Sequence, residues 1–223
     1  MDVYWEVLPE KVRMSVEFLA EQPWAGEFYL AGGTGVALQL GHRTSLDLDL
    51  FSEANRLTFE ERQHLMMALK AYAKTGSFQV ALETEGTLTL ILQETSVSFF
   101  HYPYLLVSPL IPLIGRLHMA TLEDIGLMKI AAIIGRGRKR DFVDLYFITR
   151  QVPLARLMEL GAAKFPHVRD FAAQAARALV YFADADKERM LRMRKRVTWQ
   201  MVKRYFEGEV RRLSREWIRP GSW

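Results

Sequence analysis

The sequence of 223 residues contains no cysteine, so disulfides, thiolate zinc sites and cysteine nucleophiles are all excluded. It also lacks a long apolar run. The longest stretch without a charged residue, 95–115, contains three prolines, one histidine and four serines or threonines, which makes it a poor membrane span. The first residues show neither the basic segment nor the apolar segment of a signal peptide. From these absences we expect a cytoplasmic protein with no membrane partner.

Half of the residues are hydrophobic and a quarter are charged, which is typical of a globular chain that can bury a core. Lys and Arg number 30 and Asp and Glu 26, but these charges are unevenly placed. Residues 1–60 hold four basic and ten acidic side chains, a net charge of −6, whereas residues 186–219 hold twelve basic and five acidic ones, a net charge of +7. The C-terminal excess indicates either a polyanionic partner or a solvated helix surface.

Hydrophobic periodicity divides the chain into two parts. Up to about residue 115 we predict helices at 9–21, 34–40 and 58–74 and strands at 28–31, 45–51, 78–83, 87–93 and 96–102. Beyond that point only helices are predicted, at 121–134, 140–149, 153–164, 168–183 and 198–214. Strands followed by a run of helices are typical of an α+β fold. We therefore expect an N-terminal α/β lobe with a mixed β-sheet at 1–115 and a C-terminal helical bundle at 116–223.

The alternating segment 45–51 carries two aspartates, Asp47 and Asp49. In a strand their side chains point to one face, while Leu46, Leu48 and Leu50 point to the other, into the core. Two carboxylates about 6.5–7 Å apart on one strand face repel each other, and a divalent cation between them removes this repulsion. The pair therefore indicates a magnesium site, although a solvated sheet face is the commoner explanation for this pattern alone.

A glycine pair, Gly32-Gly33, follows a predicted strand and precedes a predicted helix. Because glycine has no Cβ, the backbone there can approach a phosphate closely, and the N–H groups that begin the helix point toward it. Thr34 adds a hydroxyl. A glycine pair alone is more often a tight turn. In combination with the strand of paired aspartates, however, it can hold a triphosphate next to its metal ion.

This combination resembles the signature of the DNA polymerase β-like nucleotidyltransferase superfamily, and more closely that of the AbiEii/AbiGii toxin family of nucleotidyltransferases. The resemblance rests on Gly32-Gly33-Thr34 and on Gly41-His42-Arg43-x-Ser45-x-Asp47-Leu48-Asp49-Leu50-Phe51. It implies a nucleotidyltransferase-like sheet and transfer of a nucleotidyl group from an NTP, with Mg2+, to an acceptor, which in related toxins is the 3′ end of tRNA. It also implies a toxin role in a type IV toxin–antitoxin or abortive-infection system, with a cognate antitoxin. Asp47 and Asp49 would then be catalytic metal ligands, and the nucleotide-binding residues would be Gly32, Gly33, Thr34, Arg43, Ser45 and Arg140.

A second block resembles the C-terminal motif of the same family. It comprises Lys129 and the segment Arg136-Gly137-x-Lys139-Arg140-Asp141-Phe142-x-Asp144-Leu145-Tyr146. Lys129 on one helix, and Asp141 and Asp144 on one face of the next, are predicted to converge on the nucleotide as catalytic residues. The lysine is a compact charge suited to a triphosphate, and Asp141 is a candidate third metal ligand or general base, with Asp144 in support. Ion pairing on a helix surface is the alternative for these aspartates.

The strand that usually supplies a third carboxylate in this superfamily is 96–102, and it contains no acidic residue. Either Asp141 supplies the third carboxylate, or metal binding is weaker, or the catalytic chemistry is degraded. The sequence therefore leaves two alternatives to the RNA-modifying enzyme. One is a non-catalytic module that binds nucleotides or RNA, and the other is a nucleotidyltransferase that acts on a small molecule.

Basic residues of the helical part are candidate contacts to RNA phosphates or to an acidic antitoxin surface, and the sequence does not decide between these partners. The candidates are Arg136, Lys139, Arg194, Arg196 and Lys203. The aromatic run at 99–104 can in principle stack a nucleic-acid base, but its alternation fits core packing better.

Overall fold

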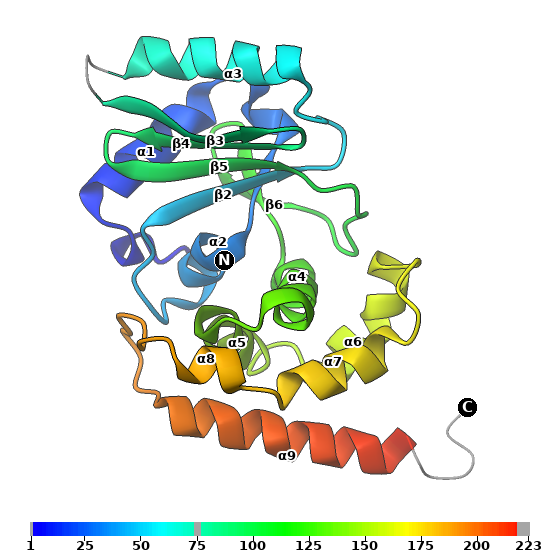
Figure 1. The fold of residues 1–223 in the computed structure, drawn as a ribbon. Coiled ribbons are helices and arrows are strands. Elements are labelled where there is room, and N and C mark those ends of the chain that lie inside the picture. Colours follow the sequence, from blue (N-terminus) through cyan, green and yellow to red (C-terminus); the bar gives the residue numbers. More distant parts are fainter. Residues whose placement is uncertain (1, 74–76, 218–223) are drawn as a thin grey trace. The chain divides into compact units, whose positions relative to one another are not determined.

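The computed structural model describes residues 2–73 and 77–217 (Figure 1). The chain forms two compact units, which we call unit 1 (Met1–Thr121) and unit 2 (Leu122–Trp223). In the described residues every strand belongs to unit 1, and unit 2 consists of helices and their connections. The predicted α+β class is therefore confirmed.

Unit 1 is built on one mixed sheet with the strand order β3-β4-β5-β2-β1-β7-β6. β2 is parallel to β5 and β1 is parallel to β7, whereas the other neighbours are antiparallel. The strands are β1 (Tyr29–Leu30), β2 (Asp47–Ser52), β3 (Phe78–Thr84), β4 (Thr87–Leu92), β5 (Thr95–His101), β6 (Ile111–Ile114) and β7 (Leu117–Met119). The helices are α1 (Glu10–Glu21), α2 (Gly32–Leu40) and α3 (Phe59–Tyr72), with 3-10 turns at Trp5–Val7 and Pro23–Glu27.

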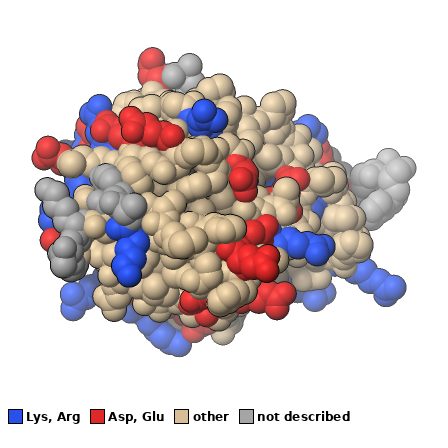
Figure 2. Space-filling model, turned by 90° about the horizontal axis from the view of Figure 1, so that it is seen from above, with Lys and Arg blue, Asp and Glu red and all other residues tan. Residues whose placement is uncertain are grey.

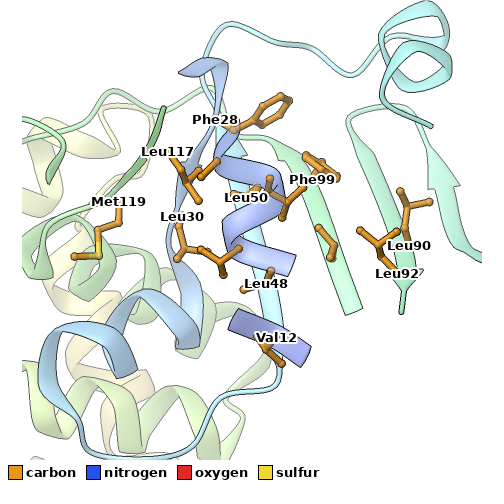
Figure 3. Close-up of a cluster of buried hydrophobic side chains, with 14 of the residues drawn as sticks. Val12, Phe28, Leu30, Leu48, Leu50, Leu90, Leu92, Phe99, Leu117 and Met119 are labelled. Atoms are coloured by element: carbon orange, nitrogen blue, oxygen red, sulfur yellow. The ribbon is translucent and has the colours of Figure 1, made fainter. Parts of the chain in front are cut away.

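One face of this sheet forms the core of unit 1, which Figure 3 shows in close-up. Alternate residues of the central strands are buried there against apolar side chains of α1 and α3, among them Leu48, Leu50, Leu88, Leu90, Leu92, Val97, Phe99, Val12, Val16, Leu65 and Leu69. The prediction that Leu46 joins this core is wrong. Its side chain is 59% exposed, because β2 begins only at Asp47 and the preceding residue is not held to the sheet's alternation. The opposite face of the sheet carries the aspartates.

α3 begins at Phe59, one residue after the predicted start, and Thr58 is its N-cap. The Thr58 hydroxyl accepts a hydrogen bond from the Glu61 N–H at 3.4 Å, and the Glu61 carboxylate accepts one from the Thr58 N–H at 2.7 Å. This reciprocal capping box satisfies two donors at the helix N-terminus. The predicted end of the helix, Lys74, lies outside the described residues.

The hairpin of β6 and β7 is missing from the sequence prediction, which placed the division of the chain between residues 115 and 116. That position lies in the hairpin's turn, where Gly115 has a φ of +53° and its Cα faces the Ala20 carbonyl group closely. β6 contains Pro112 and is an edge strand, where a proline without an N–H is tolerated. The hairpin extends the sheet of unit 1, and the chain divides after Thr121.

Unit 2 consists of α4 (Leu122–Arg136), α5 (Lys139–Ile148), α6 (Leu154–Lys164), α7 (Phe171–Leu179), α8 (Ala183–Asp186) and α9 (Trp199–Trp217). The helix predicted at 168–183 is interrupted after Leu179. The break places Phe182 against the rings of Phe142 and Trp199, at centroid distances of 5.3 and 5.7 Å. Phe206 also contacts Phe142, so α5 and α9 share an aromatic core. In the part of the chain that the structure describes, no helix has the length and apolar character needed to cross a bilayer.

Figure 2 shows the side of the molecule on which α3 lies in Figure 1. Acidic and basic side chains both occur on this side, and uncharged residues make up most of the visible surface.

Candidate functional site

The two aspartates of β2 lie on the sheet face opposite the core. Leu48 and Leu50 are 1% exposed on the core side, whereas Asp47 is exposed and Asp49 is partly exposed on the other side. In a strand, carboxylates at this spacing lie about 6.5–7 Å apart. Within residues 2–73 and 77–217, no group of three or more His, Cys, Asp or Glu side chains is arranged to hold a metal ion. A cation at this pair would therefore take its remaining ligands from phosphate or water.

The glycine turn brings the start of α2 next to Asp49. The Ala31 N–H donates to the Asp49 carbonyl at 3.0 Å, and the chain then turns into α2 through Gly32, whose φ is +59°. A Cβ on Gly32 would overlap the Asp49 carboxylate. The residue must therefore be glycine both for its backbone conformation and for the close approach of the aspartate.

The beginning of α2 presents backbone donors beside the aspartates. The first bond of this helix runs from the Gly35 N–H to the Ala31 carbonyl, at 2.9 Å. The N–H groups of Gly32, Gly33 and Thr34 precede that bond, and by helix geometry they have no carbonyl partner within the helix. Together with the helix dipole, such donors favour an anion at this end. The structure thus brings the predicted phosphate-binding glycines and the predicted metal ligands together within unit 1.

The Thr34 side chain makes contacts within unit 1. It is 1% exposed, and its hydroxyl lies 2.7 Å from the Ser45 hydroxyl and donates to the Asp47 carbonyl oxygen. Arg43 is also buried, and its guanidinium donates to the Thr44 carbonyl at 3.1 Å and to the Ser45 hydroxyl at 3.4 Å. These contacts tie the loop before β2 to α2. Contact between these three residues and a nucleotide stays a prediction.

Replacing Gly32 with alanine is expected to destabilise unit 1 by at least about 1–2 kcal/mol, because alanine is disfavoured at a positive φ, and to push Asp49 from its position. We therefore expect a loss of activity larger than the loss of stability explains. Urea unfolding and the rate of nucleotidyl transfer are the two measurements. Gly208→Ala is the matched control, because a Cβ on that residue of α9 meets no atom within 4 Å. An active Gly32→Ala protein would contradict the assignment of this turn.

Hydroxyl groups occupy the strand positions beside the aspartates. In the parallel pair of β2 and β5, Ser96 is the register partner of Asp47, and Ser98 is the partner of Asp49. The Ser98 hydroxyl lies 3.1 Å from that of Thr89 on β4. The structure thus confirms that this neighbouring strand offers no third carboxylate. The alternation at 96–102 was the signal that could have shown these serines to share a face with the aspartates.

In unit 2, Lys129 of α4 lies between two aspartates of α5. Its ammonium is 2.9 Å from Asp141 Oδ1 and 2.7 Å from Asp144 Oδ2. Both carboxylates are fully buried, and Lys129 is 6% exposed. The Arg136 guanidinium, which is half exposed, donates to Asp141 Oδ2 at 3.1 Å. The structure therefore brings these predicted residues together as a buried ionic cluster, and their action on a nucleotide stays a prediction.

Ionisation of this cluster should make the stability of unit 2 depend on pH. Burial alone would raise the pKa of Asp141, but the Lys129 charge and the Arg136 hydrogen bond outweigh it, and the pKa falls below its ordinary 3.8. Burial alone would lower the pKa of Lys129, but the charges of Asp144 and Asp141 outweigh it, and the pKa rises above 10.5. The lowered pKa of Asp141 stabilises the folded state of unit 2 above the unfolded pKa of that carboxyl, and this stabilisation is lost as the pH falls. The raised pKa of Lys129 stabilises the folded state below pH 10.5, and this stabilisation is lost as the pH rises.

We therefore expect the free energy of unfolding of unit 2 to be level between about pH 5 and pH 9 and to fall on both sides. Urea titrations followed by circular dichroism at 222 nm measure it. In Asp141→Asn the decline in acid should be weaker, whereas Asp184→Asn, a change at an exposed carboxylate, should leave it as in the wild type. If the free energy of unfolding declined equally at low pH in the wild type and in both variants, Asp141 would not be the source of the acid dependence.

The predicted basic contacts in unit 2 divide into two groups. Lys139 is buried, and its ammonium donates to the Glu188 carbonyl while it lies 5.1 Å from the Trp199 ring centroid. Lys203 is 2.9 Å from Asp186 and also contacts that ring. These two lysines bind α5 and α9 to the segment 186–188, which precedes α9. Because Lys139 is buried, it is not available as a surface contact. Exposed basic residues are Arg136, Arg194 and Arg196, and Arg140 is partly exposed.

Comparison with known proteins identifies the family of the chain. The family model described as "Nucleotidyl transferase AbiEii toxin, Type IV TA system" matches residues 16–218. An uncharacterized protein of Aquifex aeolicus (strain VF5) is 31% identical over 208 residues, which make up 92% of this chain and 96% of that protein.

Two solved structures share the fold. MenT4, a nucleotidyltransferase toxin from Mycobacterium tuberculosis H37Rv, has a TM-score of 0.56 and 16% identity over 89% of this chain and 82% of its own. ANT(2″)-Ia in complex with adenylyl-2″-tobramycin has a TM-score of 0.51 and 13% identity over 71% of this chain and 98% of its own. At these identities the likeness establishes the fold alone.

Proposed function

The chain belongs to the AbiEii family of nucleotidyltransferase toxins of type IV toxin–antitoxin systems, and from this premise we propose that it transfers a nucleotidyl group from an NTP to the 3′ end of an RNA, with tRNA as the first candidate. Magnesium is the proposed cofactor. The observation that supports the proposal is the contact of the glycine turn with Asp49, which places the start of α2 beside a pair of carboxylates in one unit.

The residues present fit a magnesium ion. Asp47 and Asp49 supply hard oxygen ligands from one strand face, and the missing Cβ of Gly32 leaves the room that the Asp49 carboxylate occupies. These two residues would hold the ion, whose charge, when it is bound, stabilises the charge on the transferred phosphate. The serines on β5 provide no third carboxylate, so the remaining coordination positions of the ion would be filled by phosphate oxygens and water.

The chain's own part in the reaction is to place the triphosphate. The backbone N–H groups of Gly32 and Gly33 would bind phosphate oxygens, and the Thr34–Ser45–Arg43 contacts hold the loop in front of the aspartates. In the transfer, the acceptor oxygen forms a bond to the α-phosphorus. The bond from that phosphorus to the pyrophosphate breaks, and the acceptor's proton leaves to solvent.

We also propose a cognate antitoxin with an acidic contact surface as a partner. The C-terminal excess of basic residues supports this proposal, and so does the family to which the chain belongs. Exposed Arg194 and Arg196 are the proposed contacts. Salt-dependent binding of the antitoxin, weakened in Arg194→Ala/Arg196→Ala, is the expected result.

The test uses total RNA and each of the four NTPs, labelled in parallel at the α- or the γ-phosphate. Label from the α-position should appear on RNA and label from the γ-position should not, because pyrophosphate is the leaving group. EDTA and Asp47→Ala should abolish the labelling. Absence of α-label on RNA from the folded wild-type protein would overturn the RNA proposal.

The same experiment distinguishes the alternatives. A nucleotidyltransferase that acts on small molecules would label an added aminoglycoside but not RNA. The fold shared with ANT(2″)-Ia is the observation that favours this alternative. A binding module would retain the NTP or RNA without any transfer of label.

A further inference from the structure

Three aromatic rings on neighbouring strands form a stack on the sheet face that carries the aspartates. Tyr29 on β1 and Phe51 on β2 stack at a centroid distance of 6.0 Å and an interplanar angle of 24°, and Phe51 and Phe100 on β5 stack at 5.0 Å and 27°. We call Tyr29, Phe51 and Phe100 the aromatic ladder. All three are register partners across their strands, so the ladder runs across the sheet at one level.

The aromatic ladder lies one step along β2 from the proposed metal site. Phe51 follows Asp49 by two residues and shares its face, so the two side chains are about 6.5–7 Å apart along the strand. The start of α2 lies at the other end, where Gly32 approaches Asp49 and the Thr34 hydroxyl donates to the Asp47 carbonyl. The glycine turn and the carboxylates therefore lie at one level of β2, and the aromatic rings lie two residues further along the strand.

The aromatic ladder stops at Phe100, although the sheet continues. The register partner of Phe100 on the next strand is Thr87, and the partner of Thr87 on β3 is Thr84. Neighbouring strands are about 4.8 Å apart, which is also the spacing at which a further ring would continue the stack. At that position the chain has only a threonine side chain. Phe100 and Thr87 are partly exposed and Thr84 is exposed, so the stack ends on an accessible strip of sheet.

Core packing does not account for Phe100. The core ring at this place is Phe99, which is fully buried and packs against Phe28 and Trp24 at 5.2 and 5.7 Å. Phe100 points to the opposite face. The alternation of the aromatic run thus places Phe99 in the core and Phe100 on the face with the aspartates. The sequence pattern alone attributes the whole run to core packing.

We propose that an unpaired nucleobase of the acceptor RNA stacks on Phe100 over Thr87 and continues the aromatic ladder. Aromatic side chains bind single-stranded nucleic acid in this way, because every base has a π-face. The acceptor is the occupant that the geometry favours. With the triphosphate at the glycine turn, as proposed, the attacking hydroxyl approaches the α-phosphorus from the side opposite the pyrophosphate, and the aromatic ladder is the sheet surface that lies beyond Asp49, away from the start of α2.

The inference rests on the proposed function, since it assigns a place to the acceptor of that reaction. Its test compares two RNA oligonucleotides that share a sequence and a 3′-hydroxyl, one of which carries an abasic terminal nucleotide. For the wild-type protein we expect the abasic end to raise the acceptor KM about 5- to 150-fold, the range that base–aromatic stacking supports. Phe100→Leu should raise the KM of the intact acceptor similarly and should no longer distinguish the two oligonucleotides, while the NTP KM stays unchanged.

Phe100→Tyr should restore the discrimination, since it keeps the ring. Phe59→Leu is the matched control, because Phe59 is an exposed phenylalanine of α3, on the core side of the sheet. Circular dichroism and thermal unfolding establish that each variant is folded. A rise in the NTP KM in place of the acceptor KM would assign the stack to the incoming nucleotide and overturn the inference. Equal use of both oligonucleotides by the wild type would also overturn it.

Failure of the proposed function has a different signature. If the wild-type protein labels no RNA, the acceptor site is still tested by fluorescence anisotropy with the two oligonucleotides and no NTP. Tighter binding of the intact oligonucleotide, lost in Phe100→Leu, would support a base-stacking site without the transfer reaction. Equal binding of both oligonucleotides would reject the stacking site as well.

Discussion

Replacing Asp49 with asparagine is expected to lower kcat/KM for nucleotidyl transfer by roughly 10³-fold, which corresponds to about 4 kcal/mol of transition-state stabilisation. Asparagine keeps the size and the position of the side chain next to Gly32 but removes the charge that would hold a cation. Radioactive transfer assays at saturating RNA and a range of Mg2+ concentrations measure the loss. We expect no Mg2+ concentration to restore the wild-type rate.

Two controls separate a catalytic effect from a structural one. Asp184→Asn removes an exposed carboxylate in unit 2 and should leave the rate unchanged. Asp49→Asn itself should unfold at nearly the wild-type urea concentration, because Asp49 is partly exposed and asparagine keeps the backbone carbonyl that accepts the Ala31 hydrogen bond. A rate within tenfold of the wild type would show that Asp49 is not the metal ligand that the sequence pattern predicts.

Replacing Lys164 with methionine is expected to have the largest effect on stability, a loss of about 3–5 kcal/mol. Its ammonium lies 2.7 Å from Asp124 Oδ1, and neither side chain is exposed at all. Lys164 ends α6 and Asp124 lies in the first turn of α4, so the pair joins two helices of unit 2. The variant leaves a carboxylate in the interior without its main counter-charge, which is far more unfavourable than removing a solvated ion pair.

The double variant Asp124→Asn/Lys164→Met provides the decisive comparison. It removes both charges, so we expect it to recover a large part of the lost stability. Lys187→Met, which breaks an exposed pair with Asp184, should change little. Urea unfolding followed at 222 nm measures all four proteins. If the double variant is less stable than Lys164→Met, the two charges do not act as a pair.

The local secondary structure is largely predictable from the sequence. The periods of two and 3.6 residues locate most of the helices and strands, and they place the start of α3 within one residue of its observed position. Alternation alone puts Asp47 and Asp49 on one face of β2. These are properties of consecutive residues, so no distant part of the chain is needed to establish them.

The sequence analysis fails where a long-range partner decides the outcome. The sequence pattern predicts no strand at β6, and it assigns Leu46 to the core although β2 begins only at Asp47. Lys139 looked like a surface cation for RNA, but Glu188 and Trp199 enclose it. No feature of the residues around these positions distinguishes the two outcomes.

The sequence by itself thus determined which chemical groups are available: a glycine turn, two carboxylates two residues apart on a strand, and a basic C-terminal part. Only the tertiary structure decided how those groups are used. It placed Gly32 against Asp49, put serines beside the aspartates, and drew Lys129 and Asp141 into a buried cluster. The reason is that a side chain's type and periodicity are local, whereas its burial and its partner follow from strand order and helix packing across the whole unit.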